Sequence, residues 1–257
     1  MKLFNFIILL ITTTSITGFA QLKPVQYNDG TQLLIGFEIN PQKANTANPG
    51  VLILPAWMGI DKLSKDTAKK LSNMGYYAFV ADVYGEGNYP KNYDDAGKMA
   101  GYYKKNITEY HKRISLALEQ LIQSGANPNN IIVIGYCFGG TGALEAARAN
   151  MRVKAVVSFH GGLGKDTSRT INPIKAKILV LHGADDPYES KEEIASFQQE
   201  MRDSKADWQM IYYSNAVHSF TNPEAGNDNS KGAAYNENAS KRSWQHFKLF
   251  LDEIFYK

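Results

Sequence analysis

The chain has 257 residues, of which 44% are hydrophobic and 21% are charged, and its formal net charge is +3. This length is enough for one large domain with a substantial core, and the composition is ordinary for a soluble globular protein. The small net charge and the lack of a Lys/Arg run argue against nucleic acid, and against a polybasic membrane contact, as the main partner.

The first twenty residues have the pattern of a targeting segment. Lys2 gives a positive start, residues 3–11 are almost wholly apolar, and Gly18-Phe19-Ala20 fits a small-x-small cleavage site. We therefore expect a signal peptide at residues 1–20 and an exported mature chain at residues 21–257, periplasmic or secreted. The alternatives are a short buried helix or a retained anchor, although the apolar run is shorter than the ~20 residues that span a bilayer.

The first half of the mature chain predicts strands that alternate with helices. Residues 25–27 and 33–37 predict a hairpin, because Asp29-Gly30 between them is a typical hairpin turn. The apolar run at 51–54 predicts a buried parallel strand, followed by a helix from Asp61 to about Met74 and a strand at 77–81. We expect residues 86–103, rich in Tyr, Asn and Gly, to form a long connection that lies over the sheet edge as a partial lid. Apolar residues at helical spacing predict a helix over 107–123.

The second half continues the alternation. Strands are predicted at 131–134, 154–159, 177–181 and 208–213. Ser190 and Glu193 form a capping-box pattern for a helix that ends near residue 202, and a polar loop at 214–232 leads to a last amphipathic helix. The fold class is therefore α/β, with a doubly wound, mostly parallel sheet that carries helices on both faces in a single domain.

The segment Gly135-Tyr136-Cys137-Phe138-Gly139 lies between the strand at 131–134 and a run of helix formers. Strand, tight glycine turn and helix form the context of a nucleophile elbow, whose strained central residue projects its side chain above the sheet edge. Glycine is needed at 135 and 139 because a side chain there would meet the crossing helix or strand. The alternative is a free, buried cysteine at the end of a glycine-rich strand.

Cys137 is the only cysteine of the chain, so an intrachain disulfide is impossible. An unpaired thiol is a liability in an oxidising compartment. A lone thiol on an elbow of an exported protein is therefore easier to explain by chemistry than by packing.

A cysteine nucleophile needs a base, and the base needs an acid that orients it. His218 follows the last strand, where an imidazole can reach the elbow, and His160, at the end of the strand after the elbow, is the second choice or a wall of the pocket. The acid is expected after the preceding strand, where the common Gly-x-x-Asp pattern selects Asp186 and leaves Asp185 as the alternative. The other three histidines are expected to be structural or to lie on helices: His111, His182 and His246.

These segments resemble the dienelactone hydrolase family of α/β-hydrolases, in which the chain order is also nucleophile, acid, base. The resemblance runs from about residue 51 to the last helix and is carried by residues 135–140, 182–187 and 217–223. It implies Cys137 as nucleophile, Asp186 as acid and His218 as base. It also implies an oxyanion hole from the backbone N–H groups of Phe138 and Trp57.

Two positions depart from the family pattern. The dienelactone enzymes carry a Glu on the first loop that interacts with the thiol, and alignment gives Ala56 here. They also carry an Arg shortly after the Asp-x-Tyr stretch, where this chain has Glu86 two residues after Tyr84. Because an acidic residue would repel a carboxylate, we expect neutral esters to be preferred and dienelactone itself not to be the substrate. Candidate pocket residues are Tyr84, Glu86 and His160.

The sequence therefore predicts an exported hydrolase of small carboxylic esters, thioesters or lactones that works through an acyl-thioester intermediate. We expect no cofactor and no metal, because neither a metal-ligand spacing nor a phosphate-binding loop occurs. The expected partner is a small ester or lactone, and the chain is expected to be a monomer or a homodimer. The alternatives are a non-catalytic exported binding protein on the same fold, which Ala56 and Glu86 favour, and an acyltransferase with the same triad.

Overall fold

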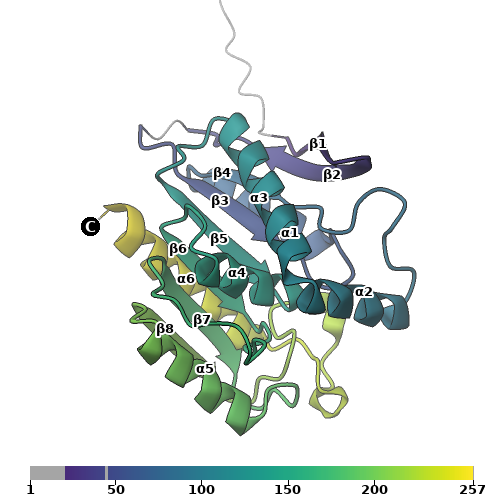
Figure 1. Ribbon diagram of the computed structural model, residues 1–257, viewed down its shortest axis with the longest axis vertical. Coiled ribbons are helices and arrows are strands. Elements are labelled where there is room, and N and C mark those ends of the chain that lie inside the picture. Colours follow the sequence, from purple (N-terminus) through teal and green to yellow (C-terminus); the bar gives the residue numbers. More distant parts are fainter. Residues whose placement is uncertain (1–20, 44–45, 257) are drawn as a thin grey trace, which may run out of the picture.

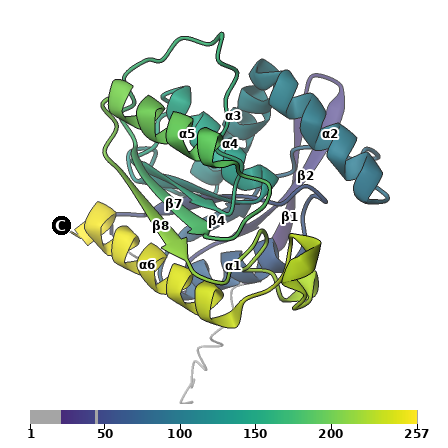
Figure 2. The same ribbon diagram turned by 90° about the horizontal axis from the view of Figure 1, so that it is seen from below.

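The computed structural model describes residues 21–43 and 46–256, so the predicted signal peptide lies outside the described residues. A central sheet lies between two layers of helices, as Figures 1 and 2 show from two directions. Within the described part, the sheet has eight strands in the order β1-β2-β4-β3-β5-β6-β7-β8. The pairs β1–β2 and β2–β4 are antiparallel, and β4, β3, β5, β6, β7 and β8 run parallel. The predicted fold class is confirmed.

The element bounds are close to those predicted for most of the chain. The strands are β1 (Lys23–Asp29), β2 (Gln32–Ile39), β3 (Gly50–Leu54), β4 (Tyr77–Val80), β5 (Ile131–Tyr136), β6 (Ala155–Phe159), β7 (Lys177–Gly183) and β8 (Trp208–Tyr213). The helices are α1 (Lys62–Asn73), α2 (Tyr93–Lys105), α3 (Ile107–Gln123), α4 (Phe138–Arg148), α5 (Lys191–Asp203) and α6 (Glu237–Tyr256). Two short 3-10 turns, η1 (Pro223–Ala225) and η2 (Asn229–Lys231), lie in the polar loop before α6.

Both predicted helix starts with a capping residue are confirmed. The Asp61 side chain accepts a hydrogen bond from the Ser64 N–H at 2.8 Å, and the Ser64 hydroxyl lies 3.1 Å from the Asp61 nitrogen. Ser190 and Glu193 form the same reciprocal pair at the start of α5. Each box satisfies backbone groups that the first helical turn leaves without intrahelical partners.

The core has two halves, one on each face of the sheet. On β5, Ile131 and Val133 pack on the face covered by α3, α4 and α5, while Ile132 and Ile134 pack on the face covered by α1 and α6. Figure 2 shows these two helical layers above and below the sheet. Burial on both faces explains why the parallel strands are continuous apolar runs rather than alternating ones.

The expected long connection over residues 86–103 is wrong in its second half, because α2 begins at Tyr93. The Asn92 side chain caps it by accepting from the Asp95 N–H at 2.9 Å, and Ala96, Ala100 and Tyr103 face the core. Gly97 and Gly101 weaken the local helical signal, so this helix is stabilised by its cap and its buried face. The expected covering segment is therefore helical (Figure 1).

The parallel strands bring six loops to one edge of the sheet. Trp57 follows β3, Tyr84 follows β4, Cys137 follows β5, His160 follows β6, and Asp186 and His218 follow β7 and β8. The carboxyl ends of parallel strands are the usual place for a site in this class of fold. Within residues 21–43 and 46–256, no helix is both long and apolar enough to cross a membrane.

Candidate active site

The backbone at Cys137 is a strained turn between β5 and α4. Its φ of 53° and ψ of −116° lie in a region that residues with a side chain rarely adopt. A Cβ on Gly135 would lie 1.9 Å from the Gly139 oxygen, and a Cβ on Gly139 would lie 2.1 Å from the Leu54 oxygen. The prediction that these two glycines permit the turn is therefore confirmed.

Hydrogen bonds from neighbouring strands hold this turn. The Cys137 N–H donates to the Phe159 carbonyl at 3.0 Å, and the His160 Nδ1 lies 3.2 Å from the same nitrogen. The Cys137 carbonyl accepts from the Thr141 N–H at 3.2 Å, as the first turn of α4. The surrounding structure thus offsets a backbone strain of about 1–3 kcal/mol and leaves the residue partly exposed.

The three side chains that the sequence predicts as a triad form a hydrogen-bonded series. The His218 Nδ1 lies 2.9 Å from the Asp186 Oδ2, and the His218 ring is also hydrogen-bonded to the Cys137 thiol. Because Nδ1 is engaged with the carboxylate, Nε2 is the nitrogen available to the sulfur. Asp186 is buried and also accepts from the Tyr188 N–H at 3.0 Å, whereas Asp185 is exposed. The geometry therefore selects Asp186 over Asp185.

The electrostatics of the pair favour charge separation. Burial raises the pKa of the Cys137 thiol, but the charge and hydrogen bond of His218, the Phe138 N–H and the charge of Lys104 together bring it below its ordinary value. Burial lowers the pKa of His218, while the charges and hydrogen bonds of Cys137 and Asp186 raise it to about 10. Opposite shifts of this kind stabilise a thiolate beside an imidazolium.

His160 lies against the elbow rather than at an open wall. Only 2% of the residue is exposed, and its Nε2 lies 2.7 Å from the Thr221 hydroxyl. Since Nδ1 faces the Cys137 N–H as acceptor, Nε2 carries the proton and donates to Thr221. Burial, and then the charge of His218, hold its pKa well below the usual range, so the ring is neutral. The structure thus corrects the expectation of a pocket wall, because both ring nitrogens are engaged internally.

Of the two residues that the resemblance implies for an oxyanion hole, Phe138 faces the thiol directly, and Trp57 is connected to Phe138 through Tyr84. The Phe138 N–H is hydrogen-bonded to the Cys137 sulfur, so this donor faces the nucleophile. Among the described residues, the Trp57 N–H has no hydrogen-bond partner. The Tyr84 hydroxyl donates to the Trp57 carbonyl at 2.7 Å, and the Tyr84 ring stacks on Phe138 with centroids 6.0 Å apart. Tyr84 therefore contacts both residues.

Tyr110 is a residue that the sequence reasoning assigned only to the core. Its ring also stacks on Phe138, with centroids 4.6 Å apart, and its hydroxyl donates to the Phe138 carbonyl at 3.0 Å. Two tyrosine hydroxyls thus hold the carbonyls of Trp57 and Phe138, one each. The helical spacing of Tyr110 predicts its burial but gives no signal for this contact.

Glu86 does not lie where the sequence argument placed it. Its side chain is exposed, one carboxylate oxygen lies 3.5 Å from the Tyr89 hydroxyl, and it is not among the residues that line the cavity beside Tyr84. Water and salt screen an exposed charge of this kind. The repulsion of carboxylates that we expected from Glu86 therefore loses its structural basis.

Two charged residues were missed from the sequence, and the charge of one of them, Lys104, acts on the thiol. A Cβ on Gly162 would lie 3.4 Å from both the Lys104 Nζ and the Glu189 Oε1, so these groups converge on the loop after β6. Burial raises the pKa of Glu189 to about 7, although its carboxylate accepts from the Leu163 N–H at 3.0 Å. Neither residue belongs to a sequence motif, so only the folded loops reveal them.

In the part of the chain that the structure describes, no three His, Cys, Asp or Glu side chains gather in a way that could hold a metal ion. A thiol, an imidazole and a carboxylate in series, next to the Phe138 backbone donor, are parts of nucleophilic acyl transfer.

The strand order and the elbow after β5 define an α/β-hydrolase. The model of the dienelactone hydrolase family matches residues 35–255, and the chain belongs to this family. The solved structure m3DLH is 31% identical, with a TM-score of 0.87 over 93% of this chain and 100% of that one.

Two further relatives extend this comparison. A structure described as a dienelactone hydrolase-like promiscuous phosphotriesterase from metagenomic libraries is 34% identical, with a TM-score of 0.85 over 92% of this chain and 99% of that one. An uncharacterized Caenorhabditis elegans protein, K02A2.1, is 37% identical over 131 residues, which are 47% of this chain and 78% of the worm protein. The predicted ester-hydrolysing enzyme is confirmed at the level of the family.

Proposed function

We propose that this enzyme hydrolyses small carboxylic esters, thioesters or lactones by covalent catalysis at Cys137. The observation that carries the proposal is the hydrogen-bonded series from Asp186 through His218 to the thiol on a strained elbow. The lowered pKa of the thiol and the raised pKa of the imidazole supply the thiolate that such chemistry needs.

In the first half-reaction, the Cys137 thiolate attacks the carbonyl carbon and forms a C–S bond while the carbonyl π electrons move to oxygen. Collapse of this tetrahedral species breaks the bond to the leaving alcohol, which takes a proton from the His218 imidazolium. Asp186 holds the ring in the tautomer and orientation that this transfer requires. The products of this step are an acyl-thioester and a free alcohol.

In the second half-reaction, neutral His218 removes a proton from water, and the resulting hydroxide attacks the thioester carbonyl. Collapse expels the Cys137 thiolate and releases the carboxylic acid, so the thiolate–imidazolium pair is restored. The N–H groups of Phe138 and Trp57 would stabilise the oxyanion in both steps. Removal of one such donor typically costs about 3–4 kcal/mol of transition-state stabilisation.

The substrate class follows from the charges near the thiol. Ala56 stands where the dienelactone enzymes carry an acid, and Glu86 is exposed. Neither residue therefore determines whether the enzyme prefers a charged or a neutral acyl chain. Lys104 is the charged residue outside the triad whose field lowers the thiol pKa. We propose that small esters are accepted with Lys104 as the main electrostatic influence on the acyl group. A neutral phosphotriester also belongs in the substrate panel, because one relative is described as a phosphotriesterase.

The experiment that tests the proposal is hydrolysis of short p-nitrophenyl esters by the purified chain and by Cys137→Ala. We expect at least about a thousandfold loss of kcat/KM in the variant, as for removal of a covalent nucleophile. Mass spectrometry of the quenched wild-type reaction should show one acyl group on Cys137. Equal rates in the two proteins would remove the claim of a cysteine nucleophile.

The two rival functions predict different results. A non-catalytic binding protein would bind esters without turnover, and Cys137→Ala would bind as well as the wild type. An acyltransferase would partition the acyl group to added alcohols beyond their share relative to water. For the proposed hydrolase, we expect ester formation from added alcohol to remain in proportion to the alcohol:water ratio.

Export is a separate proposal, based on the targeting pattern of residues 1–20. N-terminal sequencing of the protein purified from its source should begin at Gln21, and a start at residue 1 or 2 would refute cleavage. We also propose a monomer or a homodimer, which light scattering of the mature chain measures directly.

A further inference from the structure

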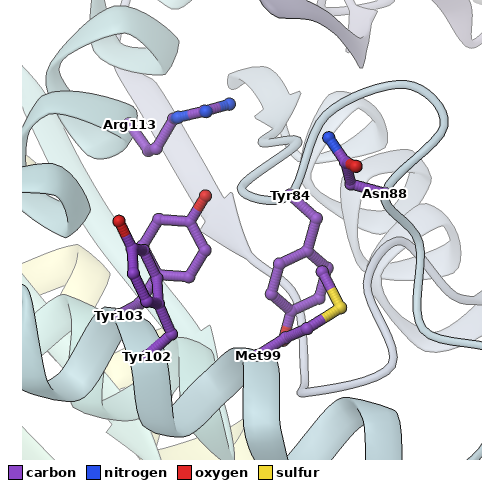
Figure 3. Close-up of a pocket in the computed structure, with 6 residues that line it drawn as sticks. All are labelled: Tyr84, Asn88, Met99, Tyr102, Tyr103 and Arg113. Atoms are coloured by element: carbon purple, nitrogen blue, oxygen red, sulfur yellow. The ribbon is translucent and has the colours of Figure 1, made fainter.

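A cavity lies beside Tyr84, whose ring also stacks on Phe138 of the candidate active site. It has a volume of about 250 Å³ and is bounded by the segment after β4, by α2 and by α3, with Tyr84, Asn88, Met99, Tyr102, Tyr103 and Arg113 as its lining (Figure 3). Tyr84, Tyr103 and Arg113 are buried and form its floor, while Tyr102 and Asn88 are exposed at its mouth. Cys137, Asp186 and His218 do not line it.

Arg113 is the charged group of this cavity, and its hydrogen-bonding capacity is not used by the protein. The residue is only 9% exposed, and its Nη1 is buried with no hydrogen-bond partner among the described residues. Its Nε lies 3.0 Å from the Asp29 Oδ2, as an ion pair without hydrogen-bond geometry. A buried donor left unsatisfied costs about 1–3 kcal/mol, so a ligand or water that accepts from it is favoured.

The surrounding charges leave this guanidinium incompletely neutralised. Asp29 is shared between Arg113 and Lys112, whose Nζ lies 2.5 Å from its other oxygen. Asp82, the other carboxylate near these tyrosines, accepts from the N–H groups of Ile35, Tyr84 and Gly85 and from the Tyr89 hydroxyl. The Asp82 oxygens are therefore occupied. Among the described residues, the Arg113 guanidinium is paired with Asp29 alone, and Lys112 shares that carboxylate.

The residues that line the cavity and its volume indicate the chemistry and the size of its ligand. Figure 3 shows Arg113 on the same side of the space as the hydroxyls of Tyr102 and Tyr103, with Tyr84 and Asn88 opposite and Met99 at the lower edge. Aromatic rings and a thioether suit an apolar body, and a guanidinium suits a planar carboxylate. The volume of about 250 Å³ is below the range of roughly 300–1,000 Å³ usual for drug-sized ligands, which favours a single ring or a short chain.

We propose that this cavity is a binding site for a small organic carboxylate with an aromatic or short aliphatic body, held by Arg113. The site is separate from the thiol, because neither Cys137 nor Phe138 is among the residues that line the cavity, although Tyr84 lines it and stacks on Phe138. Tyr84 also connects the two places, since its hydroxyl donates to the Trp57 carbonyl.

Isothermal titration of the full mature chain with benzoate tests the site, with neutral benzamide and aliphatic hexanoate as comparisons. We expect saturable binding of benzoate, binding of hexanoate, and affinity for benzamide weaker by about tenfold, as for loss of one charge-assisted pair. Cys137→Ala should bind benzoate as tightly as the wild type. Binding lost in Cys137→Ala would mean that the acid occupies the candidate active site, which overturns the proposal.

Two variants address the cavity from different sides. Arg113→Met removes the cation and keeps an apolar stem, and Met99→Trp fills the space from α2 without changing Arg113. Each should weaken benzoate binding by about tenfold or more, whereas Arg152→Met, a matched change at an exposed arginine, should have no effect. If Arg113→Met fails to fold in a thermal melt, Met99→Trp decides the question. Unchanged binding in the folded cavity variants, or no saturable binding of either acid by the wild type, refutes the site.

Discussion

The elbow at residues 135–139 and the segment from Asp82 to Lys105 contact each other through Phe138 and Tyr84, yet they are stabilised differently. In the elbow, backbone atoms lie so close to positions 135 and 139 that only glycine, which has no side chain, fits there. In the other segment, contacts distant in sequence decide the conformation, such as Asp82 with the Ile35 N–H and Tyr84 with Trp57. The glycines of the elbow form a short motif, so the backbone constraint can be predicted from the sequence even though Gly139 meets Leu54 on another strand, whereas side-chain contacts without a motif require the fold.

The sharpest test of this comparison is one substitution made in both regions. Gly139→Ala would place a Cβ 2.1 Å from the Leu54 oxygen, and we expect a loss of about 3 kcal/mol or more in the free energy of unfolding. In Gly101→Ala on α2, the new Cβ meets nothing within 4 Å, so we expect a gain of about 0.5–1 kcal/mol. Urea denaturation followed by circular dichroism measures both, and similar losses would contradict the comparison.

The second prediction is that the elbow side sets the pH dependence of kcat/KM. Activity should rise with pH as the thiol, whose pKa is lowered, loses its proton, and should fall near the His218 pKa of about 10, as the imidazolium that protonates the leaving group is lost. On the acid side, the decline should approach tenfold per pH unit.

Glu189 supplies the control for that profile, because its pKa of about 7 lies on the acid side of the His218 pKa of about 10. Glu189→Gln should keep the acid limb that we assign to the thiol. If the acid limb disappears in this variant, the group that titrates there is the Glu189 carboxyl and not the Cys137 thiol.

The third prediction concerns the contact that joins the two regions. Tyr84→Phe keeps the ring on Phe138 but removes the hydrogen bond to the Trp57 carbonyl. We expect kcat to fall by about tenfold with KM nearly unchanged, because the proposed Trp57 donor shifts but is not lost. Tyr93→Phe is the matched control, since Tyr93 is exposed and its ring stacks on the Trp57 indole with centroids 5.6 Å apart. Equal effects of the two variants, or an effect on KM alone, would contradict a positioning role.

The smallest expected effect concerns the preference for anionic over neutral esters, which we attribute to Lys104 and not to Glu86. Lys104→Met should lower kcat/KM for an anionic ester relative to its neutral analogue by about threefold, as expected for one partly screened charge. Glu86→Gln should leave this ratio unchanged, because its side chain is exposed. Competition between hemisuccinate and butyrate esters measures the ratio. A changed ratio in Glu86→Gln with an unchanged ratio in Lys104→Met would contradict this prediction and assign the charge preference to Glu86.

The same distinction explains what the sequence could predict. The positions of Cys137, Asp186 and His218 follow from strand ends and chain order, and burial then separates Asp186 from Asp185. The helix α2 escaped prediction because its two glycines lower the local propensity, while its cap and buried face stabilise it. The contacts of His160 with the elbow depend on how the loop after β6 folds back, and no motif encodes that.

Cys137, which is partly exposed, carries the only thiol in the chain, and this has a practical consequence. A chromogenic disulfide reagent added to the folded protein counts intact elbows directly, one equivalent per chain, with no background from other cysteines. A fluorophore or spin label would likewise attach at a single known atom at the carboxyl edge of β5. Such a probe would report on ligand arrival at either side of Tyr84 without any engineered attachment point.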